Sequence, residues 1–378
     1  MTGVGTVAFP GPMRFEVPSE LEAHEPPEAR GLSRDQVRLM VAYRSDLRLV
    51  HARFRDLASY LGAGDLLVIN NSGTLPASIR AARSDGTLLE LHLSIPLPSG
   101  QGPVDLDAPP GPDAQIWVVE FRRPSGNDSM PFRRPQSGET LTLPQGGALE
   151  VLEPYPPDCG PVEGTPRESR LWTAALRLPS PLGPYLAAHG HPIRYRHVTE
   201  EWPVSYYQTV YAREAGSAEM PSAGRAFTAE MITQLISQGV DVAPVTLHAG
   251  VASLEEHETP PAEFFRVTPQ TALRANLARE ARGRIIAVGT TVVRALETVA
   301  DRSGHVRAGE GWTGLVVSPQ RGVQVVDGLL TGWHEPRASH LLMLEAIAGR
   351  ELMERSYRAA LERGYLWHEF GDLHLVLP

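Results

Sequence analysis

The sequence has little of what stabilises a secreted protein or anchors a membrane protein. Among its 378 residues the single cysteine is Cys159, which excludes an intrachain disulfide and a cysteine-rich metal site. No apolar run reaches membrane length, and the N-terminus carries no signal-peptide pattern. Internal repeats and low-complexity linkers are also absent. We therefore expect a globular cytoplasmic protein that acts without a membrane partner, and we expect a monomer.

The sequence has fewer positively charged than negatively charged residues. The chain has 35 Lys and Arg against 44 Asp and Glu, a net charge of −9, so the molecule as a whole repels phosphate. RNA is not excluded, but it would have to meet a local basic patch. One such cluster comprises Arg122, Arg123, Arg133 and Arg134. We interpret it as charge on solvated edge strands, with a nucleic-acid contact as the alternative.

The length and texture of the chain predict two domains. Its 34 prolines and 35 glycines favour turns over long helical bundles. In residues 1–75 and 179–378, strand and helix signals alternate, which predicts a large mixed α/β domain. Residues 76–178 instead contain short alternating segments between turns, which predicts a smaller inserted antiparallel β-barrel domain. The expected barrel strands are 88–95, 115–121, 139–143, 148–152 and 170–178.

Three segments of the larger domain end in polar loops. Residues 283–300 indicate a buried strand, a Gly-Thr-Thr loop and a helix, and residues 325–349 indicate an apolar segment, a loop around His334 and a helix. Residues 65–74 are interpreted as a third such unit. Ligands bind at the carboxyl ends of strands in open α/β sheets. These loops are therefore the expected functional surface.

The remaining elements of the larger domain follow from hydrophobic periodicity and capping signals. Thr228 is placed to cap a helix that Gly239 ends. The predicted elements are a β-hairpin within residues 37–50, helices at 54–61, 227–239, 271–282 and 351–363, and strands at 242–247 and 371–377.

Three histidines, His189, His191 and His197, lie close together and raise the possibility of a metal site. A metal site normally needs further ligands, and no carboxylate or cysteine lies at helical spacing to complete one. We therefore expect no metal.

Taken in order, the polar loops resemble one family. The matching segments are DLLVIN at 65–70, YQTVYA at 207–212, PSAG at 221–224 with Phe227 and Thr228, VTLHAG at 245–250, IAVGTTVVR at 286–294, LTGWHEP at 330–336 with Ser339, LLML at 341–344, and Tyr365 with Gly371 and Asp372. This set resembles the S-adenosylmethionine:tRNA ribosyltransferase-isomerases of queuosine biosynthesis, over nearly the whole chain.

The resemblance implies a large α/β domain with a smaller β-barrel, and an unusual use of S-adenosylmethionine as a co-substrate that donates its ribosyl part. The acceptor in the family is the aminomethyl group of a 7-deazaguanine in tRNA. Adenine and methionine leave, and the product is epoxyqueuosine. No metal is implied.

The resemblance also places the candidate site residues. His248 and His334 are the expected proton carriers, since imidazole titrates near neutral pH. Asn70, Gln208 and Thr246 are expected to hydrogen-bond adenine or ribose. The other donor-binding positions are Gly250, Thr290, Thr291, Arg294 and Ser339, with Arg294 suited to the methionine carboxylate.

Three of these expectations have structural alternatives. A Thr-Thr pair before a helix is commonly a cap, so Thr290 and Thr291 could serve the helix alone. Arg294 could pair with Glu297 on its own helix. Asp372 is interpreted as structural.

Several positions depart from the family pattern, and they indicate a divergent member. They are Asn71, Ser72, Gly73, Ser78, Ala226, Ala252, Ser253, Leu254, His257, Gly332 and Glu335. Most of the changes remove charge or proton-transfer capacity. Two alternatives therefore remain open: the same scaffold acting on a small-molecule acceptor without tRNA, or a non-catalytic protein that binds adenosine or RNA.

Overall fold

The computed structural model describes residues 13–97, 102–125, 128–156, 169–251, 261–336 and 338–378. Cys159 and the family departures at Ala252, Ser253, Leu254 and His257 lie outside these residues. In the part of the chain that is described, no helix is both long enough and apolar enough to cross a membrane.

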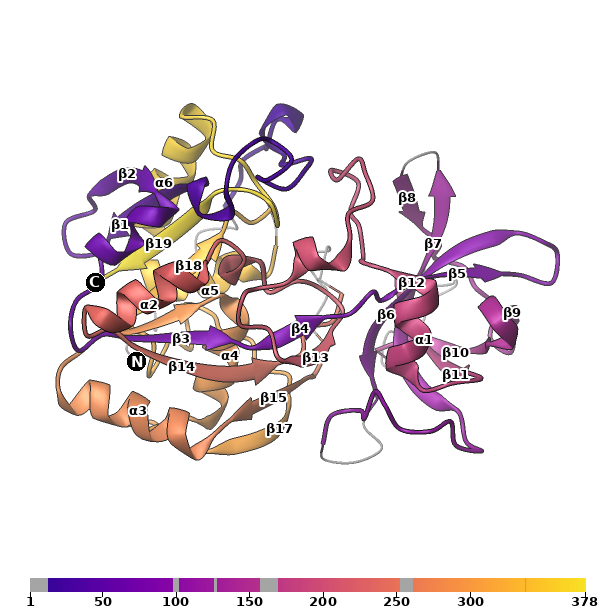
Figure 1. The fold of residues 1–378 in the computed structure, drawn as a ribbon. Helices are drawn as coiled ribbons and strands as arrows, with labels where there is room; N and C mark the ends of the chain where they lie inside the picture. The colour runs from indigo at the N-terminus through magenta and orange to yellow at the C-terminus, as the bar shows by residue number, and fades with distance from the viewer. Residues whose placement is uncertain (1–12, 98–101, 126–127, 157–168, 252–260, 337) are drawn as a thin grey trace, which may run out of the picture.

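A nine-stranded mixed sheet forms the larger domain (Figure 1). Its strand order is β17 (Gly309–Thr313), β15 (Glu263–Val267), β14 (Asp241–Leu247), β3 (Leu66–Asn70), β16 (Ile285–Val288), β18 (Gly328–Gly332), β19 (Leu373–Leu377), β1 (Arg38–Tyr43) and β2 (Leu49–Arg53). The four central strands, β14, β3, β16 and β18, run parallel. Strands β3 and β16 are buried at every residue, as continuous apolar runs are when both faces of a sheet are covered.

Helices cover both faces of this sheet. The side chains of β3 alternate between two cores, with Leu66 and Val68 on one face and Leu67 and Ile69 on the other. The first core is closed by α3 (Pro269–Glu280), α4 (Thr290–Val299), α5 (His340–Ala348) and α6 (Arg350–Glu362). The second is closed by the 3₁₀ helix η3 (Phe54–Ser59) and α2 (Ala229–Ser237).

The sequence predictions for this domain are largely confirmed. Strands β1 and β2 form the expected hairpin. The Oγ1 atom of Thr228 accepts a hydrogen bond from the backbone N–H of Met231 at 3.2 Å, which caps α2 as predicted. Strands β15 and β17, at one end of the sheet, were missed. The other 3₁₀ helices are η1 (Ser19–Leu21), η2 (Arg34–Gln36), η4 (Pro144–Gly146), η5 (Val204–Tyr207) and η6 (Ser222–Gly224).

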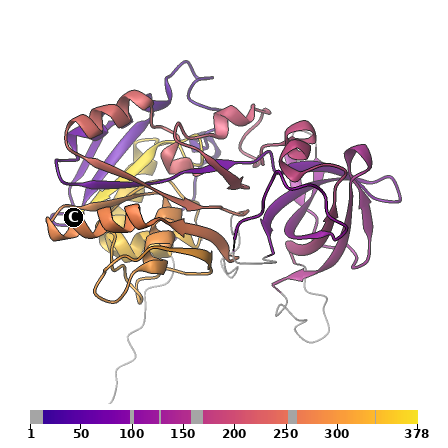
Figure 2. The same cartoon turned by 60° about the horizontal axis from the view of Figure 1, so that its bottom comes forward.

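The inserted segment forms a closed antiparallel barrel, as predicted. Strand β11 pairs with β7 and closes the circle of β5 (Ser78–Ala82), β6 (Leu88–Pro96), β7 (Gln115–Ser125), β11 (Leu171–Arg177), β10 (Ala148–Tyr155) and β9 (Thr140–Thr142). Closure leaves no free edge within this circle. Strand β8 (Asp128–Pro131) extends from β7. The two views place the barrel beside the larger domain (Figures 1 and 2).

The chain stays with the barrel beyond residue 178. Helix α1 (Leu182–His189) contributes Leu182, Tyr185 and Leu186 to the barrel core, and β12 (Gly190–His191) pairs with β5. A side chain at residue 190 would lie 2.0 Å from the backbone oxygen of Pro76, so only glycine permits this close pairing. The sequence had assigned this segment to the larger domain.

Residues 65–74 do not form the predicted strand–loop–helix unit. After β3 the chain turns into a second strand, β4 (Ser72–Thr74), which pairs in parallel with β13 (Glu214–Ser217). The turn is held by Asn70, whose Oδ1 atom accepts from the N–H of Ser72 at 3.1 Å. This side-chain bond replaces helix initiation with an extended continuation.

Candidate functional site

A cavity of about 480 Å³ lies at the carboxyl ends of β16 and β18, where the sequence had placed the functional surface. Its volume is in the range of ~300–1,000 Å³ that small-molecule sites occupy. The barrel also contributes to it, through Arg122 on β7. Five of the predicted site residues line this cavity in addition to His334: Gly250, Thr290, Thr291, Arg294 and Ser339.

One wall is the start of α4. Gly289 has φ of +94°, a left-handed conformation that favours glycine, and it precedes the first helical residues, Thr290 and Thr291. Neither threonine is the cap, because the N-cap position belongs to Gly289 and carries no side-chain capping bond. The first turn of a helix exposes backbone N–H groups that suit anions and hydroxyl oxygens. Both threonines are therefore placed to present polar groups to a ligand.

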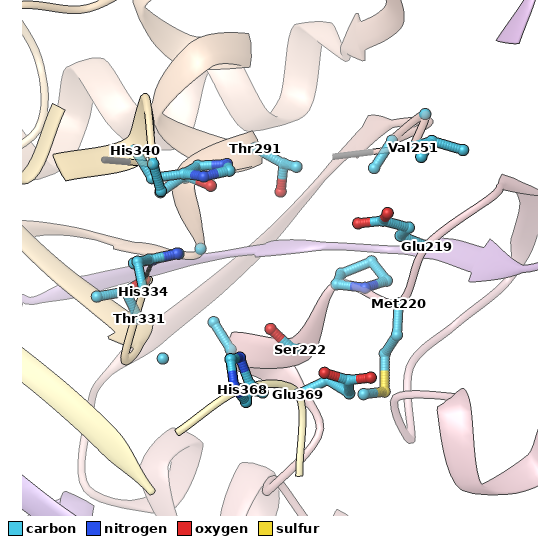
Figure 3. A pocket seen from close by; sticks show the side chains of 18 of the residues that line it. Glu219, Met220, Ser222, Val251, Thr291, Thr331, His334, His340, His368 and Glu369 are labelled. Carbon is cyan, nitrogen blue, oxygen red and sulfur yellow. Dashed lines mark hydrogen bonds between the residues drawn. The ribbon is translucent and has the colours of Figure 1, made fainter. Parts of the chain in front are cut away.

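His334 and His340 form the neighbouring wall (Figure 3). Their rings stack at a centroid distance of 4.7 Å. The Nε2 atom of His334 lies 2.8 Å from the Oγ1 atom of Thr331. Burial, together with the neighbouring imidazoles of His340, His368 and His374, holds the pKa of His334 well below its usual value. Burial and Arg294 likewise lower the pKa of His340 to about 4. Both rings are therefore neutral at physiological pH.

Arg294 is held within the protein. Its guanidinium pairs with the carboxylate of Glu263 and donates to the backbone oxygens of Thr313 at 2.9 Å and Leu315 at 3.1 Å. The other oxygen of Glu263 accepts from the N–H of Gly250 at 2.8 Å. Arg294 does not pair with Glu297, the alternative considered above, because Glu297 forms an ion pair with Arg321 at 3.0 Å.

Three predicted ligand-binding residues lie behind the cavity wall and contact protein groups. Asn70, 1% exposed, donates to the oxygen of Leu247 at 2.9 Å and to the Oγ1 atom of Thr291 at 3.2 Å. The amide of Gln208 makes two bonds to the backbone of Thr74. Thr246 donates to the Oδ1 atom of Asn71 at 2.7 Å. Asn70 and Gln208 thus hold cavity-lining residues from behind, whereas Thr246 contacts Asn71, which does not line the cavity.

His248 also lies away from the main cavity. Its Nδ1 atom is 2.8 Å from the Oγ atom of Ser72, and its ring stacks on Phe264 at 5.6 Å. Burial, with Arg266 nearby, lowers its pKa to about 4. A Cβ atom at Gly216 would lie 2.6 Å from the ring, so a glycine backbone closes over it. His248 and His334 therefore do not converge on one cavity.

A cluster of imidazoles and carboxylates at the opposite side of the cavity was not predicted. We name it the acid–imidazole cluster: Glu22, His197, Glu335, His368 and Glu369, all of which line the cavity. The Nε2 atom of His197 lies 2.8 Å from an oxygen of Glu369. Burial opposes charge on both, but their mutual attraction prevails, so it raises the pKa of His197 and lowers the pKa of Glu369 to about 2. They form a charged pair at neutral pH.

The three histidines considered as metal ligands do not meet. His197 belongs to the acid–imidazole cluster, His189 stacks on Tyr185 at 4.9 Å, and His191 lies 3.9 Å from Glu201. Within the described ranges, no group of three or more His, Cys, Asp or Glu side chains is arranged to hold a metal ion.

The basic cluster of the barrel is only partly solvated. Arg123, near the end of β7, and Arg134, beyond the end of β8, are exposed as expected, although neither lies on an edge strand. Arg122 is 5% exposed, which contradicts the sequence interpretation. It pairs with the buried Glu120 at 2.7 Å and donates to the Oγ atom of Ser129 at 2.7 Å. Successive side chains of β7 point to opposite faces, so Arg122 shares a face with Glu120, away from the barrel-core residues Val119 and Phe121. This face is buried because it lines the cavity.

The known proteins that this sequence resembles share one description. Residues 12–376 match the family described as queuosine biosynthesis protein. The chain is 35% identical over 372 residues to the S-adenosylmethionine:tRNA ribosyltransferase-isomerase of Symbiobacterium thermophilum, covering 96% of this chain and 98% of that protein. The Moorella thermoacetica protein of the same name is 34% identical over 379 residues, with the same coverage.

A solved structure is similar as well. The crystal structure of S-adenosylmethionine tRNA ribosyltransferase from Thermotoga maritima aligns with 96% of this chain and 99% of its own, at a TM-score of 0.50 and 29% identity. The fold described above is thus shared with that protein.

Proposed function

Because this chain belongs to the family of S-adenosylmethionine:tRNA ribosyltransferase-isomerases of queuosine biosynthesis, we propose that it transfers the ribosyl part of S-adenosylmethionine to a 7-aminomethyl-7-deazaguanine in tRNA, giving epoxyqueuosine. Adenine and methionine are the leaving groups. S-adenosylmethionine is a co-substrate, and no metal takes part. The observation that carries the proposal is the cavity in which the start of α4 faces the neutral His334 and His340 (Figure 3).

The start of α4 is the proposed site for the nucleoside part of the donor. Thr290 and Thr291 supply hydroxyls, and the first turn of the helix supplies N–H groups. Ser339, at the start of α5, adds a hydroxyl that makes no capping bond to its own helix. Gly250 brings the chain close to the barrel, since a Cβ there would lie 2.7 Å from the Oγ atom of Ser94. These groups together can orient ribose hydroxyls.

His334 is the proposed proton carrier. The positive sulfonium of the donor acidifies the neighbouring C5′ hydrogens, so a base of modest strength suffices to remove one. A neutral imidazole is such a base, and the lowered pKa of His334 keeps its ring neutral. Thr331, on β18, orients the ring through the contact at 2.8 Å. We assign no proton-carrier role to His248, because it lies outside this cavity.

Arg294 and Asn70 are proposed to act by positioning. Arg294 reaches the cavity, yet its ion pair with Glu263 already commits much of the guanidinium. Asn70 holds Thr291 in place from behind. Loss of either side chain would displace the wall that contacts the donor.

The test is an assay of adenine release from S-adenosylmethionine in three parallel reactions: with tRNA that carries the aminomethyl base, with the free base alone, and with no acceptor. We expect release only with the tRNA, and epoxyqueuosine in the digested product by mass spectrometry. Release with the free base would instead support a small-molecule acceptor. Donor binding without release in any reaction would indicate a non-catalytic protein, and absence of donor binding would contradict the proposal outright.

A further inference from the structure

The acid–imidazole cluster is distant from the start of α4 within the same cavity. In Figure 3, His368 and Glu369 lie on one side of the space, while Thr291 and His340 lie on the other. The proposed proton carrier His334 contacts Thr331, and the cluster acts on it only through the effect of His368 on its pKa. No step assigned above uses a group of the cluster directly, although the cluster lines the same site.

His368 is the centre of this cluster. Its ring stacks on His197 with centroids 3.8 Å apart and planes 15° from parallel. Glu22 and Glu335 lie on either side of it: Nε2 is 3.6 Å from an oxygen of Glu22, and Nδ1 is 3.7 Å from an oxygen of Glu335. Both distances exceed those of hydrogen bonds. The imidazole is thus flanked by two carboxylates that it does not bind directly.

The buried Nε2 atom of His368 has no hydrogen-bond partner, although the side chain is only 7% exposed. Buried polar atoms without partners are rare in folded proteins and call for an explanation. The backbone of His368 also has φ of +71°, an uncommon conformation for a residue with a side chain. Strained residues of this kind gather at ligand sites, where the surrounding structure enforces them.

The charge of the cluster is negative. His197 and Glu369 neutralise each other in their 2.8 Å pair. Burial, with the neighbouring His197, lowers the pKa of His368 to about 4, so its ring adds no positive charge at neutral pH. Glu22 and Glu335 are the remaining carboxylates. Burial, with Glu22 and Glu369 nearby, raises the pKa of Glu335 despite the opposing effect of His197 and Arg196, so a further cation beside it would be stabilising. An anionic ligand would be repelled here, whereas a cation would be attracted.

A primary ammonium group has the donors that this cluster lacks. It carries three N–H donors and no acceptor, while the cluster presents two carboxylates and one imidazole lone pair. We propose that Glu22, Glu335 and His368 bind a primary ammonium group of a substrate, and the identity of that substrate rests on the function proposed above. Glu369 and His197 position His368 through the stacked ring.

Two substrates of the proposed reaction carry such a group. One is the methionine part of the donor, with its α-ammonium, and the other is the aminomethyl group of the acceptor base. The chemistry of recognition is the same in both cases. Binding measurements with matched ligand pairs distinguish them without turnover.

The experiment uses titration calorimetry with two pairs of ligands. S-adenosylhomocysteine is compared with its deamino analogue, and free 7-aminomethyl-7-deazaguanine is compared with the 7-cyano base. In each pair only one member has the ammonium. The proteins are the unsubstituted chain, Glu335→Gln, and His368→Asn, in which asparagine tolerates positive φ. Glu351→Gln is the matched control, because it makes the same carboxylate-to-carboxamide change as Glu335→Gln at an exposed position of α6.

We expect the unsubstituted protein to prefer the ammonium member of one pair. Glu335→Gln and His368→Asn should each weaken that preference by about tenfold or more, as loss of a charge-assisted hydrogen bond does. Glu351→Gln should retain it. The pair that responds identifies the donor or the acceptor as the source of the ammonium.

Two results would overturn the inference: no preference in either pair for the unsubstituted protein, or a preference that both substitutions leave within about twofold. Failure of the proposed function would look different. It would leave the binding preference intact while adenine release with the modified tRNA is absent.

Discussion

The Nδ2 atom of Asn70 lies 3.2 Å from the Oγ1 atom of Thr291, which ties the end of β3 to the first turn of α4. The same amide bonds the backbone N–H and oxygen of Leu247 on β14. One buried side chain thus joins three elements at the edge where the cavity opens. The position of Thr291 depends on this amide as much as on its own helix.

Asn70→Ala should therefore destabilise the fold and loosen the donor site together. It leaves buried groups of Leu247 and Ser72 without partners, which should lower the free energy of unfolding by about 2–4 kcal/mol. Urea unfolding measures this change. Gln234→Ala, on the exposed face of α2, is the control and should change the free energy little. Equal effects of both substitutions would show that Asn70 does not support the wall.

His334→Ala should reduce turnover by about 100- to 10,000-fold, the usual contribution of a positioned acid or base. Folding and the affinity for S-adenosylmethionine should change far less, because Thr290 and Thr291 remain. Adenine release under single-turnover conditions provides the rate. His305→Ala, at an exposed histidine, should keep the full rate. A normal rate for His334→Ala would remove this residue from the catalytic set.

His374 makes stability depend on pH. Burial lowers its pKa from 6.5 to about 3, its ring stacks on Trp333 at 4.7 Å, and neither ring nitrogen has a hydrogen-bond partner. The unfolded chain binds the proton first as pH falls below about 6.5. Stability from this residue is therefore complete at neutral pH and is lost on acidification, by about 2 kcal/mol between about pH 7.5 and about pH 5.

His374→Phe keeps a flat ring and removes the titrating group. We expect its free energy of unfolding to fall less on acidification than that of the unsubstituted protein, because the contributions of all other groups cancel in the comparison. Urea unfolding at both pH values tests this. Identical pH dependence in the two proteins would mean that His374 is not buried in its neutral form.

Glu263→Gln should destabilise the protein by about 3–5 kcal/mol, since it leaves the guanidinium of Arg294 buried beside a neutral group. Adding Arg294→Met should restore part of the loss, because the uncompensated charge is gone. Thermal or urea unfolding of the two single variants and the double variant gives the coupling energy. Strictly additive losses would contradict the close pairing of the two side chains.

Much of the architecture was readable from short stretches of sequence. The apolar run at 285–288 became β16, the alternating segments at 88–95 and 115–121 became strands of the barrel, and Thr228 caps its helix. Each of these predictions depends on neighbouring residues, because the spacing of apolar side chains indicates which face of an element is buried. The ordered loop motifs also identified the family, which the relatives confirm.

The direction of individual side chains was not readable in this way. Asn70 ends β3, and His248 and Thr291 follow β14 and β16 at the same edge of the sheet, yet of the three only Thr291 lines the main cavity. Arg122 and Arg123 are adjacent, and one is buried while the other is exposed. Motif position places a residue at the edge but leaves open whether protein groups already satisfy its polar atoms.

The sequence by itself determined most of the strands and helices, the inserted barrel and the family, because local periodicity and motif order are properties of consecutive residues. Only the tertiary structure decided which polar groups share a cavity. Glu22 reaches His368 because the N-terminal segment pairs with Trp367 near the C-terminus, across most of the chain. Such meetings depend on packing between distant segments, and no local pattern encodes them.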